Sequence, residues 1–230
     1  MKRFLYESRL FLICITIPWL GLFSATAQES RGTTSVDPGI LLKLMPIAPD
    51  QWKLTASHGY CALSAGPTME TYAVKEYLGP PPKQKDGDPT PPPPAPTTKI
   101  MMIAWGAGGE LDPDFAKFKA GAASAPGQVV GNGLCMVSGF HAIKEKTGDT
   151  GDKSFLLKVS LSPLLSAIVV IQGQEESALD SWAKFIDFAK IAKAIASFRG
   201  KPINPAGGFV ETKMVDELNP QNNQTSVLNY

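Results

Sequence analysis

Nine prolines lie between residues 80 and 96, and this cluster limits what the middle of the chain can form. Proline lacks a backbone N–H group and its ring fixes φ, so neither a helix interior nor a central strand can contain such a stretch. The composition predicts an extended polyproline II loop, inserted at residues 79–98 and reaching at most about 50 Å. It is either a ligand for an aromatic-lined groove or a plain insertion between two strands, and we favour the insertion.

The first 27 residues have the order of charge and hydropathy found in a secretory signal peptide. Lys2 and Arg3 open the chain, residues 10–23 are almost continuously apolar, and small residues precede the boundary between Ala27 and Gln28. This order predicts cleavage at that boundary and a periplasmic or extracellular protein. The alternative is an uncleaved N-terminal anchor, for which the apolar run is short.

Removal of the signal segment would leave 203 of the 230 residues, with nearly balanced charge. Three of the 22 basic residues and one of the 21 acidic residues lie in that segment, which leaves a net charge of −1. Without a basic stripe the chain does not attract phosphate groups, so nucleic acid is not an expected partner. No later apolar stretch has the length of a bilayer span, and we expect no transmembrane segment after processing.

The remaining sequence predicts a single α+β domain at residues 46–200, between a polar leader at 28–45 and a C-terminal tail at 201–230. The expected fold is a mainly antiparallel β-sheet packed by an amphipathic C-terminal helix and a shorter helix, in an α/β/α sandwich. Apolar alternation and Gly or Pro punctuation predict strands at residues 52–57, 60–64, 68–78, 99–105, 134–137, 141–146, 154–161 and 164–172, with one more at 209–215 in the tail.

Three segments have the features of helices. Residues 39–45 predict a short helix or turn that ends at Pro46. Residues 112–114 (Asp-Pro-Asp) combine an N-cap with a proline at the first helical position, and predict a short helix to about residue 120. Ser177 precedes a longer segment in which apolar residues, Trp182 among them, recur at helical spacing as far as Ser197. This longer helix is the one expected to pack on the sheet.

The order of these elements resembles that of the PsbP-like family. The landmarks are Pro49-x-x-Trp52, the strand at 99–105, the Val-Val-Ile-x-Gly sequence at 169–173, and Trp182 leading to Ser197-Phe198. The resemblance implies an α/β/α sandwich around an antiparallel sheet. It also implies a non-catalytic protein that docks onto a larger assembly or binds ions, and it carries over no site residues. The proline-rich insertion and the tail after Gly200 depart from the family pattern.

Two cysteines, Cys61 and Cys135, follow the predicted cleavage site. In an oxidising compartment an even number of cysteines predicts a disulfide. Closing a loop of this length would stabilise the fold by roughly 4 kcal/mol if its geometry were unstrained. The alternative is two buried free thiols on separate strands.

The same cysteines lie near the only two histidines, which suggests a metal site as a competing hypothesis. His58, Cys61, Cys135 and His141 together supply two nitrogen and two sulfur ligands, a set that suits Zn or Cu. Two observations oppose it. Positions 58 and 61 fall on opposite faces of a regular strand, and a disulfide would consume both thiolates.

No catalytic motif is convincing in this sequence. Ser181-x-x-Lys184 and Lys146-Thr147-Gly148 match two motifs of serine β-lactamases, but they occur in reversed order and we interpret the match as coincidence. We therefore expect no cofactor and predict an exported binding or scaffold domain of the cell envelope. Its partner would be a protein or another envelope component, contacted through the proline-rich loop and the C-terminal tail. The metal-binding periplasmic protein is the alternative.

Overall fold

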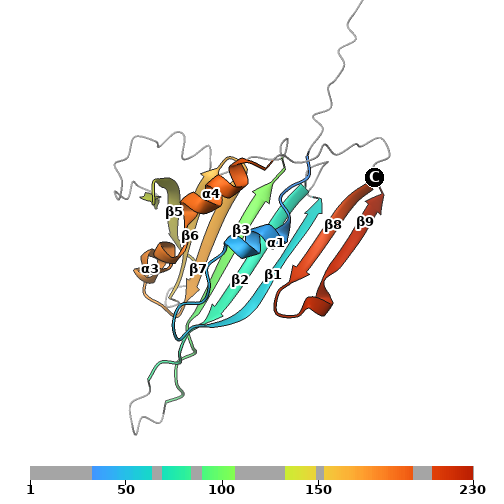
Figure 1. Cartoon of the computed structure of the whole chain (residues 1–230). Helices are drawn as coiled ribbons and strands as arrows, with labels where there is room; N and C mark the ends of the chain where they lie inside the picture. The colour runs from blue at the N-terminus through green and yellow to red at the C-terminus, as the bar shows by residue number, and fades with distance from the viewer. Residues whose placement is uncertain are drawn as a thin grey trace, which may run out of the picture.

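In the residues that the structure describes, nine antiparallel strands form one sheet, with the order β4-β5-β6-β7-β3-β2-β1-β8-β9 (Figure 1). The computed structural model describes residues 33–63, 69–83, 90–106, 133–148, 153–198 and 209–229. The predicted signal peptide with its cleavage site, and the predicted helix at 112–120, lie outside these residues. The strands are β1 Lys53–Leu63, β2 Met69–Leu78, β3 Thr97–Trp105, β4 Leu134–Val137, β5 Phe140–Lys146, β6 Ser154–Ser162, β7 Leu165–Gln172, β8 Phe209–Asp216 and β9 Gln224–Asn229.

Most of the strand predictions are confirmed, but the first two strands are in fact one. β1 continues through His58 and Gly59, which were expected to separate two short strands. A Cβ atom at Gly59 would lie 2.8 Å from both the Tyr72 carbonyl oxygen and the Pro38 Cβ atom. The glycine therefore allows the N-terminal helix to approach the sheet, and it does not break the strand.

The predicted long helix at 177–197 is divided into two. α3 covers Ala178–Phe185 and α4 covers Phe188–Ala196. Ile186 has extended backbone angles, and the side chain of Asp187 accepts a hydrogen bond from the Lys190 N–H at 2.9 Å, which caps α4. The change of direction buries Ile186 and Phe188 together, so packing on the sheet overrides the continuous helical pattern.

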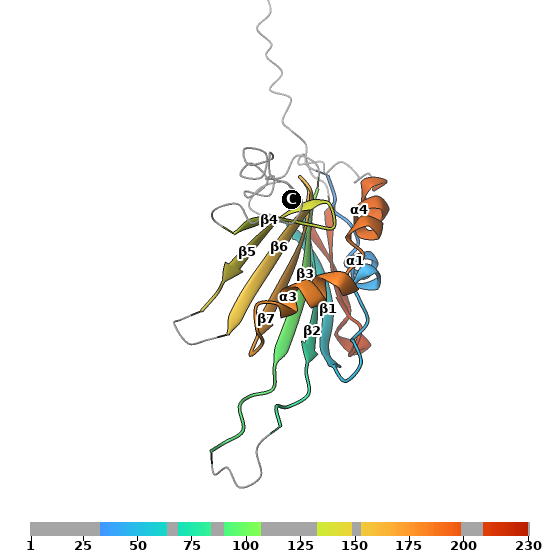
Figure 2. The ribbon, with the colours of Figure 1, turned by 90° about the vertical axis from the view of Figure 1, so that its left-hand side faces the viewer.

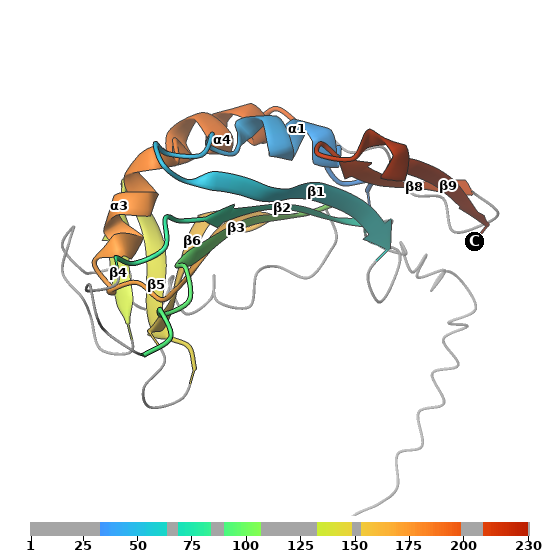
Figure 3. The same cartoon turned by 90° about the horizontal axis from the view of Figure 1, so that it is seen from below.

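All three described α-helices, α1 (Pro38–Leu44), α3 and α4, lie on the same face of the sheet (Figure 2). A short 3₁₀ helix, η1 (Pro220–Asn222), lies between β8 and β9. The core fills the space between these two layers and includes the fully buried Leu41, Leu157 and Ile191. Figure 3 shows that the edge strands bend away from the helices, so the face without described helices is concave. The antiparallel α+β architecture is confirmed, and the described helices form one helical layer.

The packed domain extends beyond both of its predicted boundaries. Leu41 and Leu42 of α1 are fully buried, and Val36 and Met45 join them in the core, so this segment is packed on the domain and is not a polar leader. The predicted tail forms the β8–β9 hairpin, and β8 pairs with β1. Lys213 of this hairpin donates to Asp37 at 2.5 Å, so the two ends of the described chain are joined to each other.

Candidate functional site

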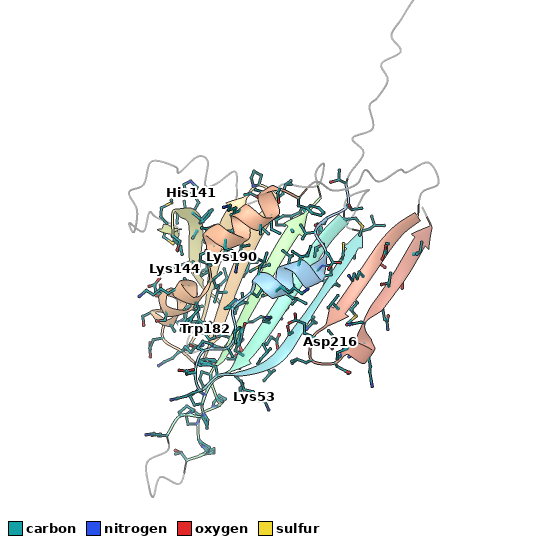
Figure 4. The ribbon with its side chains drawn as sticks, in the orientation of Figure 1. Lys53, His141, Lys144, Trp182, Lys190 and Asp216 are labelled. Carbon is teal, nitrogen blue, oxygen red and sulfur yellow. The ribbon has the colours of Figure 1, made fainter. Side chains whose placement is uncertain are left out.

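The four residues of the predicted metal site are not brought together. His58 and Cys61 lie on β1, whereas Cys135 lies on β4 and His141 on β5. Six inter-strand steps of about 4.8 Å separate β1 from β4, or roughly 29 Å along the sheet. Figure 4 shows the same separation. His141 lies toward one edge of the sheet, and Asp216, which pairs with His58, lies toward the other edge.

The predicted disulfide is therefore wrong, and the alternative of two buried thiols on separate strands is what the structure contains. Burial raises the pKa of the Cys61 thiol, although a hydrogen bond with Thr71 acts in the opposite direction. Burial likewise raises the pKa of the Cys135 thiol. Both side chains are protonated and shielded at neutral pH, which makes them poor nucleophiles and poor metal ligands. Among the described residues, no group of three or more His, Cys, Asp and Glu side chains is arranged to hold a metal ion.

The concave face carries rows of side chains that cross several strands. One row runs from Met214 on β8 through Tyr60 on β1 and Tyr72 on β2 to Ile103 on β3. These residues lie directly opposite one another in the register, so their side chains are neighbours on one face of the sheet. No described helix covers this row.

Four residues at one end of this face form what we call the aromatic cluster: Tyr60, Tyr72, Trp105 and Glu70. The rings of Tyr60 and Tyr72 are stacked, with centroids 4.9 Å apart and planes inclined by 19°. Glu70 lies opposite Trp105 in the register and accepts a hydrogen bond from its indole N–H at 3.2 Å. Its second carboxylate oxygen accepts from the Tyr72 hydroxyl at 2.5 Å. One carboxylate thus fixes the position of two aromatic rings.

The electrostatics of the cluster suit recognition better than catalysis. Burial, together with the hydrogen bond to Glu70 and its charge, raises the pKa of Tyr72 far above its ordinary value. The phenol stays protonated and continues to donate to the carboxylate. Because both oxygens of Glu70 already accept hydrogen bonds within the cluster, this carboxylate is held as an acceptor and is not poised as a general base. Tyr60 keeps 43% of its surface exposed, so the stacked pair presents a ring to solvent.

A hollow of about 600 Å³ lies beside α4 at the end of β3. Its walls are mostly apolar, with Val36, Leu165 and Ile195 among them, and Lys193 is the one charged side chain among the described residues that line it. The described lining residues include no carboxylate or imidazole that could act as a base beside a nucleophile. As far as these residues define it, the hollow suits an apolar group.

No protein-family model, curated protein or solved structure matches this chain. The resemblance to the PsbP-like family accordingly stays a prediction, and function has to be inferred from geometry. Sequence analysis missed the aromatic cluster, although one signal was available. Tyr60 and Tyr72 are each six residues from Gly66, and a Gly-Pro pair at 66–67 is typical of a turn, so a hairpin would place the two rings opposite each other.

None of the described helices combines the length and the apolar character that a bilayer span needs.

Proposed function

We propose that this protein is an exported, non-catalytic binding domain of the cell envelope, which contacts a protein partner through the aromatic cluster on its concave face. One observation carries the proposal: a stacked tyrosine pair is partly exposed and fixed by Glu70 on a face without described helices. Export is supported by the charge and hydropathy order of residues 1–27.

Fixed aromatic residues are well suited to binding. Tyr and Trp are enriched among the residues that dominate protein–protein affinity, because they offer a large apolar area together with a polar group. The rings of the aromatic cluster are held by the stack and by two hydrogen bonds to Glu70. A side chain that is already ordered loses little conformational entropy when a partner covers it. The cluster is therefore preorganised for contact.

The proline-rich segment supplies a second contact surface in this proposal. Pro80, Pro81 and Pro82 on one side and Pro91 to Pro94 on the other are exposed, and the described parts of the segment project beyond the ends of β2 and β3 (Figure 2). The Gly79 N–H donates to the Pro96 carbonyl at 2.8 Å and closes the base of the segment. An exposed polyproline segment is stiff, so it can reach a partner at a small entropic cost.

Truncation of the exposed ring tests the proposal. We expect Tyr60→Ala to weaken capture of the envelope partner by about 2 kcal/mol, or roughly 30-fold. Truncation of a residue at the centre of an interface has an effect of this size. The measurement is the amount of partner that co-purifies with the exported protein. Phe185→Ala is the matched control, because Phe185 on α3 is also exposed (55%) but lies on the helical side. Equal losses for the two variants would contradict the assignment of the concave face.

A further inference from the structure

β9 is one of the two terminal strands of the sheet, and nothing in the described part of the chain protects it from pairing. Its six residues, Gln224–Asn229, contain neither a charged side chain nor proline, the usual means by which edge strands avoid association. The opposite edge differs, because β4 has only four residues and is followed by a turn in which Gly139 has φ +84°. Of the two described edges, β9 is the one that can accept another strand.

The hydrogen bonds of β8 determine which residues of β9 face outward. The Glu217 N–H donates to the Ser57 carbonyl at 2.8 Å, so the backbone of Glu217 points toward β1. Backbone direction alternates along a strand, hence Met214 and Thr212 point toward β9. Their partners are Gln224 and Ser226. The intervening residues Thr225, Val227 and Asn229 therefore direct their N–H and C=O groups to the free edge.

We propose that two copies of this chain associate through β9, in an antiparallel pair centred on Val227. Val227 then lies opposite Val227 of the partner subunit, and Thr225 lies opposite Asn229 of the partner subunit. The outward-facing set is self-complementary about its middle residue, which a two-fold axis requires. No charges oppose one another within the strand pair, and the 60% exposed Val227 gains an apolar neighbour.

This arrangement continues the sheet from one protomer into the next. A two-fold axis at an antiparallel strand pair is perpendicular to the sheet, so both concave faces point to the same side. The dimer would present two aromatic clusters together, and a partner with repeated epitopes would be bound with greater avidity than by one copy. The pairing itself rests on β9 alone and does not depend on the proposed role of the aromatic cluster.

Sedimentation of the mature protein across the micromolar to low millimolar range tests the pairing. We expect a concentration-dependent dimer for the wild type and for Val227→Thr, and a monomer for Val227→Pro. Proline at 227 removes an outward N–H group that makes no bond to β8, so the thermal unfolding curve should be preserved. A monomeric wild type at all concentrations, or a Val227→Pro variant that still dimerises, would overturn the proposal.

Cysteine cross-linking tests the register without relying on a destabilising substitution. Residues opposite one another in the expected pair at Val227 have Cα atoms about 5.5 Å apart, which suits a disulfide, whereas the two copies of Ser226 are too far apart. Under mild oxidation we expect a covalent dimer from Val227→Cys and none from Ser226→Cys. Cys61 and Cys135, the cysteines of the described residues, are buried and do not compete. Equal cross-linking of both variants, or of neither, would contradict the proposed pair.

Discussion

Gly59 shows how one residue determines the contact between two elements. It lies in the middle of β1, at the point where α1 begins to cross the sheet. The atoms that a side chain would meet include the Tyr72 carbonyl of the neighbouring strand, which cannot move without breaking the β1–β2 pairing. The absence of a Cβ atom is therefore required by packing, and the backbone conformation of a strand does not itself demand glycine there.

Substitution of this glycine should destabilise the domain. We expect Gly59→Val to reduce the free energy of unfolding by about 1–3 kcal/mol, the usual cost of overpacking, in urea denaturation followed by circular dichroism. Gly139→Asn is the control. Its φ of +84° is tolerated by asparagine, and a Cβ atom there would have no neighbour within 4 Å. If both variants were as stable as the wild type, α1 would not be held against β1 as described.

At the scale of elements, the proline-rich segment behaves as an insertion between two paired strands. β2 and β3 pair from Leu78 and Thr97 onward, and one more backbone hydrogen bond joins Gly79 to Pro96. The indole of Trp52 lies against Gly79, where a Cβ atom would come within 2.9 Å of the ring. The base of the segment is thus part of the packed domain, whereas the described prolines beyond it are mostly exposed.

Replacement of residues 80–95 by the short flexible linker Gly-Ser-Gly-Ser should leave the domain folded. A linker of this composition imposes no turn type, and the Gly79 N–H can still donate to the Pro96 carbonyl. We expect the free energy of unfolding to change by no more than about 1 kcal/mol, because loop length has only a weak effect on stability. Capture of the envelope partner should fall. Cooperative unfolding lost in the shortened variant would make the segment structural and remove it as a contact surface.

Elements with local signals were predictable from the sequence, and those fixed by tertiary packing were not. The strands from 134 to 172 were found because glycine, proline and polar residues mark each of their turns. The break between α3 and α4 was missed because apolar spacing continues through Ile186 and only burial against the sheet explains it. β9 was missed because its sequence is mostly polar and its strand conformation depends on pairing with β8.

The candidate site was harder to predict because it depends on strand order. Cys61 and Cys135 looked like a disulfide pair, yet nothing local reveals that five strands lie between β1 and β4. Tyr60 and Tyr72 come together through one hairpin, which makes their contact local and in principle predictable. Trp105 joins them only because β3 pairs with β2 in the observed register, across the long proline-rich insertion.

For the molecule as a whole, the two faces of the sheet differ in what the described residues place on them. The helices and the N-terminal segment cover one face and form the core, and the hairpin of β8 and β9 extends the sheet on the side of β1 (Figure 1). The concave face keeps an ordered aromatic cluster beside apolar side chains. A domain built in this way can use one face for stability and the other for contact with a partner.

Site-specific photo-cross-linking in the producing cell measures most directly which face of the sheet contacts a partner. A benzophenone amino acid is introduced at position 60 on the concave face or at position 185 on α3, both of which are exposed in the native protein. The proposed function predicts a discrete cross-linked partner from position 60 and none from position 185. The yield from position 60 should fall in a Glu70→Gln variant, because this change weakens the hydrogen bonds that hold the rings of Tyr72 and Trp105. A partner cross-linked from position 185 alone would contradict the assignment of the concave face as the binding surface.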